Sequence, residues 1–239
     1  MEELVFRRPF TKGLEVSEEE AQEALEEQLA KHKANIKASL KEIKLRECIA
    51  WIRKDFRNTF IKDCPYHELA GNAQVFVDNF EKYFKYKGLY IYGTVGTGKT
   101  YLASLIANEM ATRGRKVLLI PFNEAVYQYN NPEDETLKTL ITSRYFDLII
   151  LDDFGSSRET DFQIEQIYNL VNGINQAHCS ITVTSNIPRQ DLAKATDLRI
   201  KRIYDRIIGF TTPIPAMIGE SKRLEKARET AANLQGMFK

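Results

Sequence analysis

The glycine-rich stretch at residues 93–100 constrains the fold of this chain more than any other feature. It reads Gly-Thr-Val-Gly-Thr-Gly-Lys-Thr and matches the phosphate-binding loop pattern G-x-x-x-x-G-K-[ST]. The apolar run 89–92 precedes it, and residues 101–108 follow with apolar side chains at helical spacing. In this strand–loop–helix order, backbone N–H groups and the helix N-terminus can bind a polyphosphate. The stretch therefore predicts a nucleoside triphosphate site.

Two side chains of this loop have specific predicted roles. Lys99 is expected to reach the β- and γ-phosphates, and Thr100 is expected to place its hydroxyl on Mg²⁺. The predicted cofactors are accordingly ATP and Mg²⁺. The residues expected to bind the nucleotide are Gly93, Thr94, Val95, Gly96, Thr97, Gly98, Lys99, Thr100 and Tyr101.

A second constellation follows the apolar run 146–151, which ends in the carboxylates of Asp152 and Asp153. Continuous apolar runs are typical of strands covered on both faces, and such strands form parallel sheets. Ligands collect beyond the carboxyl ends of parallel strands, so Asp152 is predicted to hold Mg²⁺. Asp153 is predicted to accept a proton from an attacking water and orient it. Asn186 ends the next predicted strand and is expected to position the same water.

The remaining pattern predicts an α/β fold with three layers, in which a parallel five-stranded sheet lies between helices. Further strands are predicted at 116–121, 180–186 and 209–214. Helices are predicted at 72–87, 101–108, 160–177, 191–208 and 220–234, with a mixed segment at 123–144.

Residues 1–62 are predicted to form a separate, small α-helical domain, and residues 63–239 the nucleotide-binding domain. Cys64-Pro65 interrupts the helical pattern and marks the boundary. Net charge is only +1 over 239 residues, but residues 1–30 contain nine glutamates and residues 31–62 contain ten lysines and arginines. This asymmetry indicates either partner contacts or solvated helix faces, and both readings stay open.

The sequence lacks the features of a membrane or secreted protein. No apolar run approaches 18 residues, and Met1-Glu2-Glu3 does not resemble a signal peptide. The three cysteines, Cys48, Cys64 and Cys179, are too scattered for a disulfide framework. We expect a cytoplasmic protein without membrane contact.

Basic and aromatic residues alternate at 82–87, Lys-Tyr-Phe-Lys-Tyr-Lys. Such a segment could stack on and neutralise single-stranded nucleic acid. Because it leads directly into the strand before the glycine loop, we favour the simpler interpretation that its aromatic residues belong to the core.

Three arginines are candidates for contacting the phosphates of a bound nucleotide. Arg202 and Arg206 are four residues apart and share a helix face. Either could stabilise transition-state charge on a transferring phosphoryl group of a neighbouring subunit. Arg223 opens the last predicted helix and could contact the phosphates from within its own subunit. Surface ion pairing is the alternative for each.

These motifs together resemble the AAA+ ATPases of the replicative helicase loader type (DnaC/DnaI), a group that includes the IstB transposition helpers. The resemblance covers about residues 65–235 and rests on the glycine loop, the run 148–155, Thr184-Ser185-Asn186, 202–207 and 219–223. It implies that Lys99 and Thr100 are Walker A, Asp152 and Asp153 Walker B, Asn186 sensor I, Arg206 the arginine finger and Arg223 sensor II.

The N-terminal part departs from this family pattern. The DnaI branch carries a cysteine-rich zinc module there, whereas this chain has only Cys48 before Cys64. The identity of the partner is therefore less firmly implied than the ATPase.

The resemblance implies an ATP-dependent loader of a replicative DNA helicase onto single-stranded DNA. Residues 1–62 would bind the helicase, and the ATPase domains would self-associate through nucleotide-bridged interfaces. The alternatives are a transposition helper ATPase, a P-loop kinase and a non-catalytic ATP-sensing module. Asp153 stands where many relatives have glutamate, which leaves room for weak hydrolysis stimulated by DNA or a partner.

Overall fold

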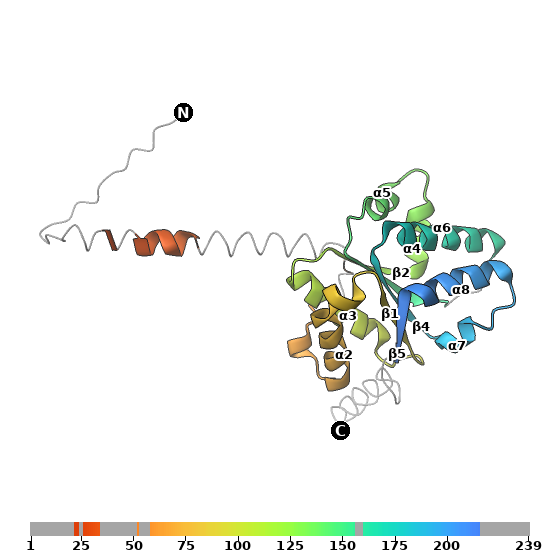
Figure 1. Cartoon of the computed structure of the whole chain (residues 1–239), viewed down its shortest axis with the longest axis horizontal. Coiled ribbons are helices and arrows are strands. Elements are labelled where there is room, and N and C mark those ends of the chain that lie inside the picture. The colour runs from red at the N-terminus through yellow and green to blue at the C-terminus, as the bar shows by residue number, and fades with distance from the viewer. Residues whose placement is uncertain (1–21, 24–25, 34–51, 53–57, 156–159, 216–239) are drawn as a thin grey trace, which may run out of the picture. The chain divides into compact units, whose positions relative to one another are not determined.

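The computed structural model describes residues 22–23, 26–33, 52, 58–155 and 160–215 (Figure 1). The chain falls into two units, Met1–Ile43 and Lys44–Lys239. In the first unit the described residues are helical and exposed, and Lys31 pairs with Glu27 at 2.6 Å. The predicted division into domains at residues 62 and 63 stays a prediction.

The second unit is built on a parallel five-stranded sheet, which confirms the predicted fold class. Its strands are β1 (Gly88–Tyr92), β2 (Val117–Pro121), β3 (Leu148–Phe154), β4 (Ser180–Ser185) and β5 (Thr211–Pro215). The strand order is β2-β3-β4-β1-β5. Because all strands run the same way, their carboxyl ends meet at one edge of the sheet, and β4 separates β1 from β3.

Helices connect the strands and cover both faces of the sheet (Figure 1). They are α2 (His67–Asp78), α3 (Lys99–Thr112), α4 (Phe122–Asn130), α5 (Thr136–Thr142), α6 (Asp161–Ala177), α7 (Arg189–Leu192) and α8 (Leu198–Phe210). Two short helices, η2 (Ile61–Asp63) and the π-helix η3 (Phe80–Phe84), flank α2. Among the described helices, none is both long and apolar enough to span a membrane.

Local sequence explains where these helices begin. Thr160 caps α6, since its hydroxyl accepts a hydrogen bond from the Gln163 backbone while the Gln163 side chain accepts one from the Thr160 backbone. Asp197 caps α8 by accepting a hydrogen bond from the Arg199 N–H at 2.8 Å. The helix predicted at 220–234 lies outside the described residues.

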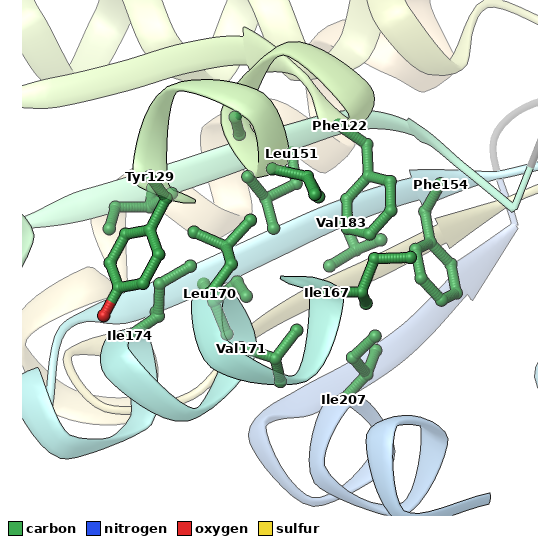
Figure 2. Close-up of a cluster of buried hydrophobic side chains, with 14 of the residues drawn as sticks. Phe122, Tyr129, Leu151, Phe154, Ile167, Leu170, Val171, Ile174, Val183 and Ile207 are labelled. Carbon is green, nitrogen blue, oxygen red and sulfur yellow. The ribbon is translucent and has the colours of Figure 1, made fainter. Parts of the chain in front are cut away.

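Two hydrophobic clusters fill the layers on either side of the sheet, because successive strand side chains point to opposite faces. In β3, Ile149 and Leu151 pack with helices α4, α5, α6 and α8, whereas Leu148 and Ile150 pack with α2 and α3. Figure 2 shows part of the first cluster, where Leu151 and Val183 of the sheet lie against Leu170 of α6. Each such side chain contributes about 1.5–3 kcal/mol by leaving water.

The chain before α2 packs against the same unit. Ile52 is buried and forms a parallel β-bridge with Leu119, so it covers part of the outer edge of β2. Asn108 of α3 donates a hydrogen bond to the Thr59 carbonyl at 3.0 Å, and the Ile61 N–H donates to Glu109 at 3.1 Å. These contacts hold residues 59–61 against α3.

The alternating segment at 82–87 divides between core and surface. Phe80 is buried, and the ring of Phe84 lies 4.6 Å from that of Phe76. Tyr83 and Tyr86, by contrast, are 58% and 66% exposed. The core interpretation therefore holds for the phenylalanines of this region and not for the two tyrosines.

The close approach of β1 to β4 at Gly88 gives a test of this packing. A Cβ added at Gly88 would lie 1.9 Å from the Ile181 carbonyl oxygen, so Gly88→Ala must push β1 and β4 apart. We expect Gly88→Ala to lower the free energy of unfolding by about 3 kcal/mol, measured by urea denaturation. Gly71→Ala is the matched control, because Gly71 lies on the exposed side of α2 and nothing lies within 4 Å of its added Cβ. The free energy of unfolding of this control should rise by roughly 1 kcal/mol. Equal decreases in both variants would contradict the described pairing of β1 with β4.

Candidate nucleotide-binding site

The glycine loop between β1 and α3 has the shape predicted from its sequence. Gly96 and Gly98 both have φ of 85°, a left-handed conformation that glycine adopts without strain. The buried Thr97 hydroxyl donates to the Thr94 carbonyl at 2.8 Å and braces the turn. Lys99 begins α3, and its ammonium donates to the carbonyls of Gly93 at 3.0 Å and Thr94 at 2.8 Å. The lysine charge is therefore held directly over the loop.

Asp152 lies at the centre of the site, at the carboxyl end of β3. This residue is only 4% exposed. The Thr100 hydroxyl donates to its two carboxylate oxygens at 2.9 and 3.1 Å, and the Thr184 hydroxyl donates to one of them at 2.6 Å. A buried carboxylate is tolerated only when such partners compensate for the lost water. Hydrogen bonds thus join the ends of β3 and β4 to the start of α3.

Asp153 occupies a different environment from its neighbour. Its φ is +65°, uncommon for a residue with a side chain, and the pairing of β3 with β4 is irregular between Leu151 and Phe154. Its side chain is exposed, and the Asn186 amide donates to it at 3.5 Å. Backbone strain of this kind occurs often at functional sites. The two adjacent carboxylates therefore differ: one is enclosed by hydroxyls and the other faces solvent beside an amide.

Thr184 is a residue whose role sequence reasoning missed. Its hydroxyl donates to Asp152 and accepts a hydrogen bond from the Asp153 N–H at 2.9 Å, so it positions both acidic residues. Ser185 faces the other way and donates to the Phe154 carbonyl at 2.8 Å. Strand alternation indicates which side of β4 Thr184 faces, but its partners depend on the strand order.

Of the predicted arginines, the two that the structure describes make no hydrogen bond or ion pair with this cluster, and the third lies outside the described residues. Arg206 of α8 donates to the Tyr168 hydroxyl at 3.1 Å, and its guanidinium carbon lies 4.5 Å from the centre of that ring. Arg202, one turn earlier on α8, is exposed. Arg223 lies outside the described residues. The structure therefore places Arg206 against α6 of its own chain.

Tyr101 packs toward α2. Its ring meets the ring of Tyr66 edge-on at 5.8 Å. Burial raises the pKa of Tyr101 to about 12, so the phenol is neutral at physiological pH.

The oxygen atoms of this site suit Mg²⁺. Mg²⁺ prefers hard oxygen ligands, keeps several waters and is often bound by one carboxylate together with substrate phosphates. Asp152 and the Thr100 hydroxyl offer such oxygens within 3.1 Å of each other. Among the described residues, no three His, Cys, Asp or Glu side chains gather into a larger metal cage.

The sheet order, the loop and the placement of Asp152 define a P-loop ATPase fold of the AAA+ type. The family described as the bacterial DnaA ATPase domain matches residues 53–208, and the chain belongs to this family.

Individual relatives are helicase loaders and replication initiators. The chain is 26% identical to the replicative helicase loader DnaI of Bacillus subtilis (strain 168), over 70% of this chain and 58% of DnaI. It is 27% identical to the chromosomal replication initiator protein DnaA of Borreliella afzelii (strain PKo), over 64% of this chain and 34% of DnaA. The chain thus spans little more than half of the first relative and about a third of the second.

Solved structures show the same fold. A crystal structure of DnaI superposes with a TM-score of 0.57 and 24% identity, over 72% of this chain and 94% of that one. A crystal structure of the DnaC helicase loader superposes with a TM-score of 0.56 and 23% identity, over 69% of this chain and 100% of that one. The fold is therefore that of the DnaC/DnaI-like AAA+ proteins.

The geometry around Thr184 generates a test. Thr184→Val keeps the shape of the side chain but removes the hydroxyl that holds Asp152. We expect the Mg²⁺ concentration that half-saturates ATP binding to rise by about tenfold or more, measured by titration with a fluorescent ATP analogue. Thr184→Ser should restore the wild-type value.

Thr182→Val is the matched control on the same strand. The Thr182 hydroxyl accepts a hydrogen bond from the Leu89 N–H at 3.2 Å and does not serve Asp152. Loss of this hydroxyl in Thr182→Val should lower the free energy of unfolding without changing the Mg²⁺ concentration that half-saturates ATP binding. If Thr184→Val also changed only stability, Thr184 would be a packing residue and not a positioning residue.

Proposed function

We propose that this chain is an ATP-dependent loader that places a replicative DNA helicase on single-stranded DNA, with ATP binding and hydrolysis as the switch between assembly and release. The observation that carries the ATP-dependent part is the cluster formed by Thr100, Asp152 and Thr184 beside the glycine loop. The loader role is supported by the similarity to DnaI and by the fold shared with the DnaC helicase loader.

In this proposal the loop backbone and Lys99 bind the triphosphate, while Thr100 and Asp152 hold Mg²⁺. The metal would neutralise the charge of the phosphate oxygens. Asp153 would accept a proton from the attacking water, and the Asn186 amide would orient that water. Arg223 would contact the phosphates from its own subunit.

Self-association would complete the site. Arg206 would exchange its contact with Tyr168 for a phosphate bound by the neighbouring chain, where its charge could stabilise the transition state. Two copies would then be joined through the nucleotide, so ATP would control assembly.

The partners in this proposal are a replicative DNA helicase, bound by residues 1–62, and single-stranded DNA. The acidic and basic halves of residues 1–62 support a role in binding a partner. DNA binding is supported by the shared fold of a DnaA structure described as bound to AMPPCP and single-stranded DNA, with a TM-score of 0.52 and 19% identity.

The whole proposal can be tested by a loading assay. The helicase from the same source is mixed with circular single-stranded DNA and the full chain, and DNA-bound helicase is separated by gel filtration. We expect retention of helicase on DNA with wild-type chain and ATP, and little with Lys99→Ala. A fragment that begins at residue 44 keeps the buried Ile52 but lacks residues 1–43 of the proposed helicase-binding region, so it should bind ATP normally and helicase more weakly than the full chain. If transposase but not helicase is captured, the transposition helper replaces the loader.

Binding and hydrolysis should separate in two variants. Lys99→Ala removes the ammonium above the loop and should weaken ATP binding by about 10- to 100-fold. Asp153→Asn keeps the size of the side chain but removes its basicity, so it should bind ATP normally and lose turnover by about 100-fold or more. Fluorescent-nucleotide titration and phosphate release measure the two effects. Equal turnover in Asp153→Asn and wild type would favour a non-catalytic ATP sensor.

A mixing experiment tests the role of Arg206 in trans. Arg206→Ala should lower turnover by about 1,000-fold, and Lys99→Ala chains should be inactive because they bind ATP poorly. A mixture of the two variants should recover part of the activity, since an intact loop can then face an intact Arg206. Arg202→Ala, one turn away on α8, is the control. An absence of recovery on mixing would place Arg206 in a role within its own subunit.

A further inference from the structure

The edge of the sheet opposite the nucleotide site carries lysines paired with tyrosines. Two such pairs, Lys82–Tyr83 and Lys85–Tyr86, lie just before β1. The third joins Lys116, just before β2, to Tyr145, just before β3. We call these six residues the amino-edge strip. We propose that this strip binds single-stranded nucleic acid through its tyrosine rings and lysine charges.

The exposure of the tyrosines is the first argument. Phe80 and Phe84 supply the apolar contacts of this segment, while Tyr83 and Tyr86 remain more than half exposed. The segment Phe80–Phe84 is a π-helix, a rare form that occurs often at functional sites. Two large rings on one short, exposed segment have no packing role that explains them.

The second argument is the position of the lysines. The ammonium groups of Lys82 and Lys116 lie 4.7 and 3.9 Å from the centres of the Tyr83 and Tyr145 rings. Lys85 lies 5.9 Å from Tyr86. The exposed rings of Tyr83 and Tyr86 are therefore flat surfaces for bases with positive charge at their sides for phosphates, the combination that sequence-tolerant single-strand binders use. Tyr145 is partly buried against the first hydrophobic cluster, so this pair contributes mainly the charge of Lys116. A base that stacks on a ring would displace the ammonium toward the strand's backbone.

The third argument is that neighbouring arginines neutralise the acidic residues of this edge. Arg113 pairs with Asp78 at 2.5 Å, and Arg115 pairs with Glu81 and with Asp147, the latter at 3.4 Å. Lys85 of the strip also lies 3.7 Å from Glu81, which Arg115 already neutralises. Lys82, Lys87 and Lys116 make no ion pair with any described residue. Positive charge is therefore left over at this edge.

The arginine contacts also show that the strip is continuous. Arg115 bridges Glu81 of the π-helix segment and Asp147 at the start of β3. Asp147 in turn accepts a hydrogen bond from the Lys116 N–H at 2.8 Å, and Lys116 covers Tyr145. The three lysine–tyrosine pairs therefore belong to one surface and not to separate sites.

Unpaired strands fit this surface better than duplexes, because paired bases hide the faces that would stack on tyrosine. This inference names a DNA-contacting surface that the proposed function leaves open, and it rests on that function only for its biological role. The strip lies at the opposite edge of the sheet from the glycine loop, so strand binding should not require ATP.

The test measures binding of the full chain to fluorescein-labelled oligothymidylate and oligouridylate by anisotropy, without nucleotide. The double variant Tyr83→Leu/Tyr86→Leu keeps apolar bulk but loses the rings, and it should weaken binding by about tenfold or more. Phe162→Leu, at a 68% exposed aromatic residue of α6, is the control and should bind like wild type. Equal binding by both variants would overturn the proposal. The preferred sugar, deoxyribose or ribose, identifies the natural strand.

The charge contribution has its own readout. The triple variant Lys82→Gln/Lys85→Gln/Lys116→Gln should reduce the slope of log affinity against log salt by about 2, since each lost phosphate contact removes about 0.7. Lys194→Gln, at a lysine paired with Asp191, should leave the slope unchanged. Displacement of the oligonucleotide by polyglutamate at equal charge concentration would show an acidic-peptide surface and overturn the proposal.

Two further measurements distinguish failure of this proposal from failure of the loader function. Lys99→Ala should bind oligothymidylate like wild type while binding ATP much more weakly, so failure of the ATPase would not affect the strip. Equal affinity for a duplex of the same length would contradict stacking on the tyrosines.

Discussion

The buried carboxylate of Asp152 is the constraint on which the nucleotide site depends. A charge on a residue that is only 4% exposed is stable only if polar groups replace the water it has lost, and the hydroxyls of Thr100 and Thr184 do so. These hydroxyls come from α3 and β4, and the carboxylate comes from β3. The three meet because β4 lies between β1, the strand before the loop, and β3, the strand that carries Asp152. The order of the strands in the sheet therefore brings the residues of the site together.

This dependence explains which features the sequence could reveal. The glycine loop, the apolar run before Asp152 and the alternation within strands are local patterns, and the structure confirms the parallel α/β fold that they predict. Strand order is set by contacts between distant segments, so the hydrogen bonds of Thr184 could not be derived from a local pattern. The positive φ of Asp153 likewise results from the irregular pairing of β3 and β4.

Surface residues were harder to predict than core residues, for a physical reason. The segment at 82–87 has aromatic residues at spacings that fit either a buried or an exposed face, and the structure leaves Tyr83 and Tyr86 exposed while Phe84 packs on Phe76. Arg206 shows the same limit, because its contact with Tyr168 depends on how α8 packs on α6. The roles of Arg206, Arg223 and residues 1–62 remain predictions.

Helix α3 runs between the glycine loop and the proposed amino-edge strip. Helix α3 begins with Lys99 at the glycine loop and ends at Thr112, next to Arg113, whose partner Asp78 lies close to the amino-edge strip. The glycine loop and the strip are thus attached to opposite ends of the same buried element, which packs along its length against β2, β3 and α2. This arrangement leaves each edge free for a different ligand, a nucleotide at one and a strand at the other.

The most direct test of the account is the effect of Asp152→Asn on ATP binding with and without Mg²⁺, measured by isothermal titration calorimetry. The amide keeps the size of the side chain and can still accept the two threonine hydrogen bonds, but it lacks the charge that would hold the metal. The account predicts that the variant binds ATP in EDTA as wild type does and loses the gain in affinity that Mg²⁺ provides. A variant that gains as much from Mg²⁺ as wild type would contradict the placement of the metal at Asp152, and with it the site described for this chain.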